Sequence, residues 1–221
     1  MIFAVIPVKK NSDRVSNKNF RPIFKNQSLL DIKIQQIDKS KLIKKIFISS
    51  DSSELKLYEK NNKKIKFIRR NKKYCNNFIS WSEMIFNVIK NLPCNDNSLI
   101  IWCHTTSPFF HRIDQSIKYF LKFEKNGFDS LFTTEKFKGF LLNANLSPIN
   151  YQWGHWHKYS QYLSPYYLIN GALFIARKKT MLESKYVIGK NPINFECDSK
   201  ESLDIDNEID FEYASYLLNK K

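Results

Sequence analysis

The amino-terminal segment carries the densest set of side chains that could bind a phosphorylated ligand. An apolar run from Ile2 to Ile6 ends at Pro7 and gives way to a polar loop. Residues 9–18 include four cations, and short hydrogen-bonding side chains lie among and after them: Lys9, Lys10, Ser12, Arg14, Asn17, Lys18 and Asn19. Lysine offers a point charge and arginine a planar fork, so together they could hold several phosphate oxygens. The segment predicts an anion site at the end of a buried strand, with a solvated turn as the alternative.

A pair of acids lies near the other end of the chain. Asp204 and Asp206 flank Ile205, and on an extended segment this spacing places both carboxylates on one side. Paired carboxylates suit a hard divalent cation such as Mg²⁺, so we expect Asp204 and Asp206 to be metal ligands. The alternative is that acids here only favour the amino-terminal end of the last helix, which is our interpretation of Glu208 and Asp210.

Polar residues also follow or interrupt two other apolar runs. His104 comes directly after residues 98–103, whose consecutive apolar side chains indicate a strand buried on both faces. Ligands gather at the carboxyl ends of such strands, so His104 could be a hydrogen-bonding group for a ligand or a general base, and we favour the first. Asn170 and Gly171 lie within residues 168–175, where they could contact a ligand or form only a turn or bulge.

Two periodicities in the apolar residues indicate the elements that must position these groups. Strands are expected over residues 2–6, 43–51, 65–68, 98–103, 128–135 and 168–175. Helices are expected over residues 28–37, 54–62, 80–91, 114–125 and 178–184, and after Asn207. We interpret Asp51 as a helix cap, and the stripe of Trp81, Met84 and Ile85 in helix 80–91 as core packing.

Five or six strands that alternate with helices predict an α/β fold, a Rossmann-like three-layer α/β/α sandwich with a mostly parallel sheet. Residues 1–221 are expected to form a single domain, since a hydrophobic content of 43% suffices for one core. Residues 136–165 break the alternation and are rich in aromatic side chains. They could form a hairpin with its own small core, but so many rings in a small lobe favour an interface between two copies.

Charge and cysteine content add few constraints. The net charge of +15 comes almost entirely from lysines spread along the chain, with only 5 glycines, so we interpret it as a compositional bias. The chain shows no signal peptide and no 18-residue apolar stretch, which predicts a cytoplasmic protein without membrane insertion. The four cysteines lie far apart, which favours reduced thiols over disulfides or zinc.

Residues Ile6–Asn19, IPVKKNSDRVSNKN, resemble the opening of the acylneuraminate cytidylyltransferases (CMP-sialic acid synthetases), I-P-A-R-x-x-S-K-R-x-x-x-K-N. The closing Lys-Asn favours the sialic-acid branch over the 3-deoxyoctulosonate branch. Lys9 and Asp13 depart from the pattern, because the family has arginine and lysine there. The identical positions are Pro7, Ser12, Arg14, Lys18 and Asn19.

Later segments are similar to motifs of the same family in the same order. Arg70 matches the arginine of R-P-x-x-L-A. Residues 104–110, HTTSPFF, resemble Q-P-T-S-P-L-R, with His104 in place of the glutamine. Residues 170–175 resemble N-G-A-I-Y-I, and residues 204–210 resemble D-I-D-x-x-x-D. Gln161 matches the glutamine of an R-Q pair whose arginine is Ser160 here.

The resemblance implies a CTP-dependent nucleotidyltransferase that needs Mg²⁺. It would transfer CMP to an acidic sugar of the sialic, legionaminic or pseudaminic type for surface-glycan synthesis, and would work as a homodimer through the 136–165 lobe. It implies Lys18 and Asp206 as catalytic residues and Asp204 with Asp206 as metal ligands. The expected acceptor contacts are His104, Gln161 and Asn170, and the expected nucleotide contacts are Lys9, Ser12, Arg14, Lys18, Asn19 and Arg70.

Two other functions stay open. A nucleotidyltransferase for another sugar would be expected to open with a Gly-rich G-x-G-x-R loop, and residues 9–14 contain no glycine. A basic nucleic-acid-binding protein would use the net charge of +15, but the chain shows no nucleic-acid-binding motif and carries the acid pair. We therefore expect no nucleic-acid partner.

Overall fold

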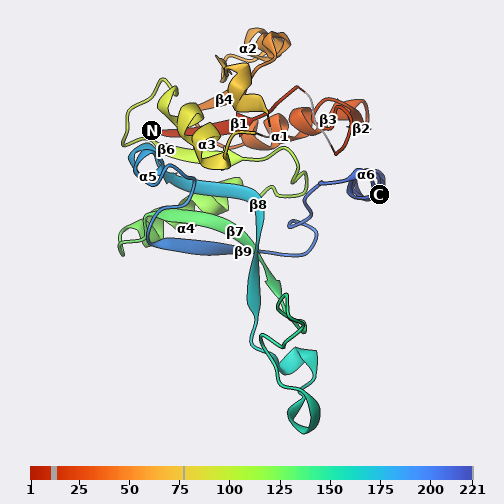
Figure 1. The fold of residues 1–221 in the computed structure, drawn as a ribbon. Coiled ribbons are helices and arrows are strands. Elements are labelled where there is room, and N and C mark those ends of the chain that lie inside the picture. The colour runs from red at the N-terminus through yellow and green to blue at the C-terminus, as the bar shows by residue number, and fades with distance from the viewer. Residues whose placement is uncertain (11–13, 77, 221) are drawn as a thin grey trace.

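The computed structural model describes residues 1–10, 14–76 and 78–220, without the side chain of Trp156. Within these residues the centre is a seven-stranded sheet in the order β5-β4-β1-β6-β8-β7-β9 (Figure 1). Its strands are β1 (Ile2–Pro7), β4 (Lys45–Ser50), β5 (Ile65–Arg69), β6 (Leu99–Cys103), β7 (Ser130–Phe137), β8 (Tyr166–Arg177) and β9 (Pro192–Cys197). A separate short hairpin joins β2 (Pro22–Phe24) to β3 (Gln27–Ser28).

The sheet is mostly parallel, as the sequence predicts. β1 pairs in parallel with β4 and β6, and β4 pairs in parallel with β5. β8 runs antiparallel to both β6 and β7, whereas β7 and β9 are parallel. The sequence does not indicate β9, because Asn194 and Glu196 interrupt its apolar residues and only Phe195 and Cys197 are buried.

Helices cover both faces and make three layers. They are α1 (Leu29–Asp38), α2 (Lys56–Asn61), α3 (Trp81–Lys90), α4 (Ile113–Glu124), α5 (Lys178–Ser184) and α6 (Glu208–Asn219). Successive strand residues point to opposite faces. Ile6 of β1 joins the core beneath α1 and α4, whereas Val5 joins the core beneath α3 and α5. The predicted α/β/α sandwich is therefore confirmed.

The carboxyl-terminal helix packs against the amino-terminal segment. Val15, Ile23 and Leu29 form a third core cluster with Ile205 and Phe211. Asn207 caps α6 as predicted, since its side chain accepts a hydrogen bond from the Asp210 backbone N–H. Residues 15–29 thus meet the segment from Ile205 to Phe211 on one side of the molecule. No helix in the described part of the chain has the length and apolarity to cross a membrane.

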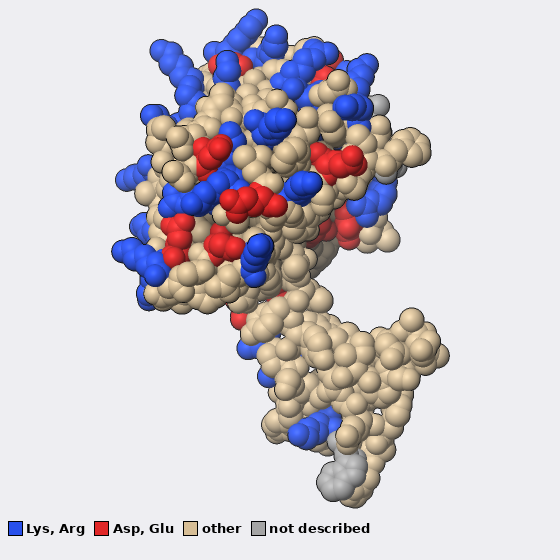
Figure 2. All heavy atoms as spheres, turned by 60° about the vertical axis from the view of Figure 1, so that its left-hand side comes forward, with Lys and Arg blue, Asp and Glu red and all other residues tan. Residues whose placement is uncertain are grey.

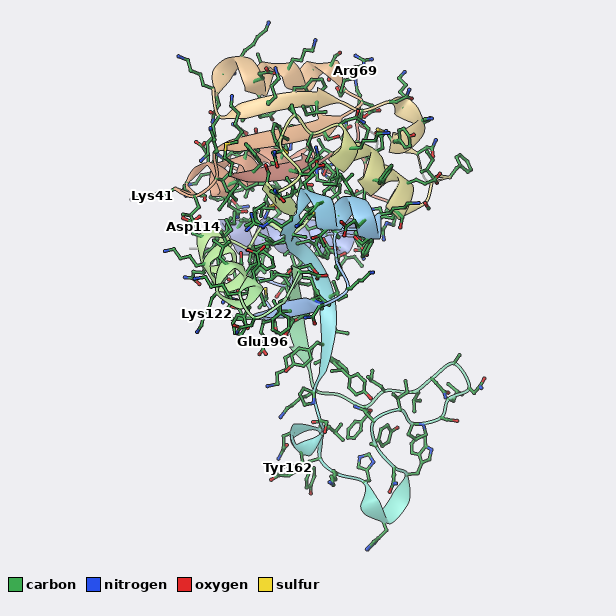
Figure 3. All side chains as sticks on the ribbon, turned by 90° about the vertical axis from the view of Figure 1, so that its left-hand side faces the viewer. Lys41, Arg69, Asp114, Lys122, Tyr162 and Glu196 are labelled. Atoms are coloured by element: carbon green, nitrogen blue, oxygen red, sulfur yellow. The ribbon has the colours of Figure 1, made fainter. Side chains whose placement is uncertain are left out.

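The segment between β7 and β8 projects from the body as an aromatic lobe, residues 138–165, with the ends of both strands leading into it (Figure 1). It is mostly irregular, and its rings pack on one another: Phe140 lies 4.9 Å from Tyr151 and 4.6 Å from His157 between ring centroids. Basic side chains with acids among them are spread over the body, whereas few charges appear on this face of the lobe (Figure 2). Tyr162 lies on the lobe, well away from the helices of the body (Figure 3).

Candidate active site

A cleft of about 820 Å³ opens at the carboxyl ends of β1 and β6. The loop after β1 and the segment that precedes α6 both line it. Nine residues that the sequence predicts for the site line this cleft. Eight of them lie in loops and one lies in β8: Lys9, Arg14, Lys18, Asn19, Arg70, His104, Asn170, Asp204 and Asp206. Ser12 lies outside the described residues.

Cations from the start of the chain meet the acid pair from its end. Lys18, only 9% exposed, donates from Nζ to the Ile205 carbonyl at 2.6 Å, between the two aspartates. Arg14 forms an ion pair with Asp206, with 2.6 Å between NH2 and Oδ1. Burial lowers the pKa of Lys18, and the charges of Asp206 and Asp204 oppose this effect. The arrangement concentrates both signs of charge in one cleft.

The acid pair fits a divalent cation. Asp204 Oδ1 is buried and has no hydrogen-bond partner among the described residues. Burial raises the pKa of Asp204, and the neighbouring Asp206 carboxylate adds to this increase. No cluster of three potential ligands occurs in residues 1–10, 14–76 and 78–220. Mg²⁺ is commonly held by only one or two carboxylates with substrate phosphates, so two aspartates with one unpaired buried oxygen suit it.

Asn19 holds the loop after β1 in place. Its Nδ2 donates to the Lys9 carbonyl at 3.3 Å, and its Oδ1 accepts from the Thr105 hydroxyl at 2.6 Å. The backbone N–H of Lys10 donates to Asp51 Oδ1 at 3.2 Å. Asp51 therefore has a structural role, but it anchors the binding loop and does not cap a helix, because Ser52 is the N-cap residue of the 3-10 helix Ser53–Leu55. From the sequence alone, an aspartate that caps a helix after a strand cannot be told from one that binds the backbone of a neighbouring loop.

Arg70 lies at the far end of the cleft and is 5% exposed. Its NH2 donates to the Val8 carbonyl at 2.6 Å, and its Nε donates to Cys75 Sγ at 3.0 Å. These contacts join the end of β1 to the segment after β5. Arg70 therefore shapes the wall of the cleft and adds positive charge to it.

His104 is fixed as a neutral imidazole. Trp102 Nε1 donates to His104 Nε2 at 2.9 Å, so the ring proton lies on Nδ1, and the ring also hydrogen-bonds the backbone of Gly171. Burial, together with the charges of Lys33 and Lys18, lowers the pKa of His104 to about 4. The lone pair that a general base needs is occupied. His104 presents ring carbon atoms to the cleft.

Asn170 and Gly171 face His104 across the cleft wall. Asn170 Nδ2 donates to Ser202 Oγ at 2.9 Å, and its Oδ1 accepts from the Ala172 N–H at 3.2 Å. Gly171 has a φ of +70°, and a Cβ there would come within 3.3 Å of His104 Nδ1. Glycine is therefore required for the close approach of the two segments.

Trp81 lines this cleft, whereas the sequence analysis assigns it to the core. Ile85 of the same stripe is buried, but Trp81 begins α3 and is 44% exposed. Its ring centroid lies 5.6 Å from that of His104 and 5.7 Å from that of Tyr186. Helical periodicity identifies the buried face but not the point at which the helix end emerges into a cleft. The lining of the cleft is consequently aromatic beside His104.

The structure does not bring Gln161 into this cleft. Gln161 lies in the aromatic lobe, where its carbonyl accepts from Lys138 Nζ at 3.0 Å. Within one chain Gln161 therefore does not line the pocket of His104 and Asn170, because the lobe projects away from the sheet (Figure 1). A contact of Gln161 with the acceptor of a second copy stays a prediction.

A cleft that holds cations, a carboxylate pair and an aromatic wall at the end of a three-layer α/β sheet defines the class of protein as a nucleotidyltransferase. A sequence model of the cytidylyltransferase family matches residues 3–220. The chain belongs to the cytidylyltransferase family, whose members are CTP-dependent nucleotidyltransferases.

Similar proteins agree with this assignment. The chain is 25% identical over 224 residues to an N-acylneuraminate cytidylyltransferase of Escherichia coli O18:K1:H7 and spans 52% of that protein, about half its length. It is 27% identical over 232 residues to post-translational flagellin modification protein B of Campylobacter coli, of which it covers 96%.

Solved structures share the fold. A CMP:2-keto-3-deoxy-manno-octonic acid synthetase complexed with CTP superposes with a TM-score of 0.68 at 11% identity, covering 98% of each chain. The 2-C-methyl-D-erythritol 4-phosphate cytidylyltransferase of Francisella tularensis superposes with a TM-score of 0.67 at 14% identity, covering 97% of this chain and 98% of that one.

Proposed function

We propose that this protein transfers CMP from CTP to an acidic sugar of the sialic, legionaminic or pseudaminic type and releases pyrophosphate. Membership of the cytidylyltransferase family supports CTP as the donor. The names of the E. coli and C. coli relatives support an acidic sugar and a role in modifying a surface structure. The observation that carries the proposal is the meeting of Lys18 and Arg14 with Asp204 and Asp206 in one cleft.

The reaction needs positioning and charge neutralisation more than a nucleophilic side chain. The anomeric hydroxyl of the sugar attacks the α-phosphorus and loses its proton to solvent. A new P–O bond forms, the bond from the α-phosphorus to the oxygen that bridges to the β-phosphate breaks, and pyrophosphate leaves with the electron pair. Lys9 and Arg14, which line the cleft, would hold the triphosphate. Lys18 is placed deeper, where it would balance the charge that develops at the α-phosphate.

Mg²⁺ is part of the proposal. Asp204 and Asp206 would hold it together with phosphate oxygens, and the bound cation would neutralise triphosphate charge. Arg14 pairs with Asp206 in the structure, so it would exchange this carboxylate for a phosphate when the nucleotide binds. The side chains of this chain thus orient the donor and exclude water from it.

The acceptor half of the cleft lies beside β6 and β8, opposite the donor half beside β1 and β5. Because both ring nitrogens of His104 and the amide of Asn170 are engaged, the wall there offers ring surfaces from Trp81 and His104. Polar recognition of the sugar acid would then come from another surface. We propose that a homodimer supplies it, with Gln161 of the partner subunit near this half of the cleft.

Exposed apolar side chains support the dimer. In the aromatic lobe Trp153 and Tyr159 are 62% and 74% exposed. Rings at such exposure are typical of protein interfaces. We place the enzyme in the cytoplasm, where CTP is available and where the free thiols of its four cysteines would stay reduced.

Pyrophosphate release tests the proposal. CTP, UTP, ATP and GTP are each assayed with N-acetylneuraminate, legionaminate, pseudaminate, 3-deoxy-octulosonate and a phosphorylated polyol, with and without Mg²⁺. We expect release only with CTP, Mg²⁺ and an acidic nonulosonate. Asp206→Ala should abolish the release and leave the fold intact. Glu208→Ala, which removes an ion pair with Arg21 outside the cleft, should keep it. No release with any acidic sugar would refute the proposal.

A further inference from the structure

A buried lysine lies behind the cleft. Lys33 in α1 is 1% exposed, and no ion pair among the described residues includes it. Its Nζ donates instead to the backbone carbonyls of Ser107 at 2.8 Å and Phe110 at 3.5 Å. Burying an ammonium group without a carboxylate is costly, and a hydrocarbon side chain would pack at this position without that cost. The ammonium group of Lys33 therefore lowers the free energy of unfolding relative to a hydrocarbon side chain at this position.

The two carbonyls belong to loop 104–110, which joins β6 to α4. One turn along α1, Gln36 donates to a third carbonyl of this loop, that of Pro108. The hydrogen bonds of Lys33 and Gln36 from helix α1 thus hold the loop from behind through its main-chain oxygens. Side-chain substitutions in the loop would leave these contacts in place, whereas loss of Lys33 would remove two of them.

The other side of the same loop holds both walls of the cleft. The Thr105 hydroxyl donates to Asn19 in the loop after β1. The Thr106 carbonyl accepts from the N–H of Ile205, between the two acids, at 2.9 Å. Loop 104–110 therefore sets the spacing between the cations and the carboxylates, and Lys33 holds that loop.

We propose that Lys33 is a positioning residue whose ammonium group fixes loop 104–110 and, through it, the distance between the phosphate-binding loop and the acid pair. The inference rests on the proposed function in that it assigns nucleotide chemistry to this cleft. The charge of Lys33 also reaches the cleft wall, since after burial it is the next cause of the lowered pKa of His104.

The ionisable groups that face Lys33 leave its charge uncompensated. Cys103 of β6 has its pKa raised by burial to about 12, and His104 has its pKa lowered to about 4, so both are neutral near pH 7. Burial lowers the pKa of Lys33 to about 8. Above that pH the group becomes an uncharged amine with one donor fewer, and its carbonyl contacts weaken.

Stability and activity should then respond to pH in opposite directions. Between the folded pKa of about 8 and the ordinary value of 10.5, the unfolded chain binds more protons at Lys33 than the folded chain. The contribution of Lys33 to the free energy of unfolding therefore rises with pH in this window and is lost as pH falls through about 8. If Lys33 positions the loop in its charged form, activity falls over the same window.

The test compares Lys33→Met with Lys178→Met. Lys178 is also buried and donates to two backbone carbonyls, those of Leu92 at 3.2 Å and Cys94 at 2.9 Å, but it lies outside the cleft and is paired with Asp96. We expect Lys33→Met to lower kcat about tenfold or more at pH 7 with only a small change in Tm, and to remove the decline in activity above pH 8. Lys178→Met should keep the wild-type kcat and pH profile.

Several results would overturn the proposal. One is that Lys33→Met keeps the kcat of the wild type and its loss of activity above pH 8. Another is that Lys178→Met loses as much kcat as Lys33→Met. The third is that the activity of the wild type stays constant between pH 7 and pH 10. The last measurement needs no variant and holds even if Lys33→Met does not fold. A wild type that is inactive with every acidic sugar refutes the proposed function instead. The pH dependence of CTP affinity, measured by calorimetry, then tests Lys33 in the same way.

Discussion

Lys18→Met should separate chemistry from stability in this cleft. The substitution keeps the length of the side chain but removes the ammonium group that lies against the Ile205 carbonyl, between two carboxylates. Loss of one donor directed at developing charge lowers kcat by a factor of about 10²–10³, or about 3–4 kcal/mol of transition-state stabilisation. We expect a kcat loss in this range with a smaller change in KM for CTP, because Lys9 and Arg14 remain to bind the triphosphate.

The effect on stability should be small by comparison. The unpaired Ile205 carbonyl costs about 1–3 kcal/mol, and removal of a buried ammonium group offsets part of this cost. A net loss of about 1 kcal/mol corresponds to a decrease of about 2–4 °C in Tm for a domain of this size. Calorimetry measures Tm, and continuous pyrophosphate release measures kcat and KM.

Arg21→Met is the matched control. Arg21 joins the same two chain segments through Glu208, with contacts of 3.2 and 2.7 Å, and stacks at 3.8 Å on the Phe211 ring, but it does not line the cleft. Its loss should lower Tm and change kcat by less than about threefold, or about 0.7 kcal/mol. The reasoning is refuted if Lys18→Met keeps kcat within that range, or if Arg21→Met loses as much activity as Lys18→Met.

Three further outcomes follow from the structure. Trp81→Ala should raise KM for the acceptor about tenfold, because about 1.4 kcal/mol of ring contact is lost, and should leave KM for CTP and Tm nearly unchanged. If steady-state kinetics show the increase in KM for CTP instead, the nucleobase and not the acceptor contacts this ring. Asp204→Asn should abolish Mg²⁺-dependent turnover yet raise Tm at neutral pH, since burial disfavours the charged carboxylate, and a lower Tm would contradict this account. Replacing Tyr159 and Tyr162, which are 74% and 69% exposed, with serine should convert dimers to monomers in light scattering, whereas an unchanged mass would exclude these rings from the interface.

The sequence predicts most of this architecture because the relevant signals are local. Consecutive apolar residues mark β1 and β6, and parallel strands bring their following loops to one edge, so the positions of Lys18 and His104 follow from topology. The spacing of Asp204 and Asp206, with the Asn207 cap directly after them, places the acids at the start of α6.

What the sequence does not reveal depends on contacts between distant segments. The neutral state of His104 is set by its burial and by the charges of Lys33 and Lys18, which lie far from it in the sequence. The edge strand β9 has too few apolar residues to show a period. Lys33 occupies a position with the sequence pattern of an ordinary helix surface, and only the packed structure shows that it is buried against loop 104–110.

Mg²⁺-dependent binding of CTP tests the central claim most directly. Calorimetric titration of the wild type should show tighter CTP binding with Mg²⁺ than without it. In the Asp204→Asn, Asp206→Asn double variant, metal-free binding should persist through the cations of the loop after β1, while the gain from Mg²⁺ disappears. An undiminished gain from Mg²⁺ in the double variant would contradict the claim that the two ends of this chain hold one metal-bound nucleotide between them.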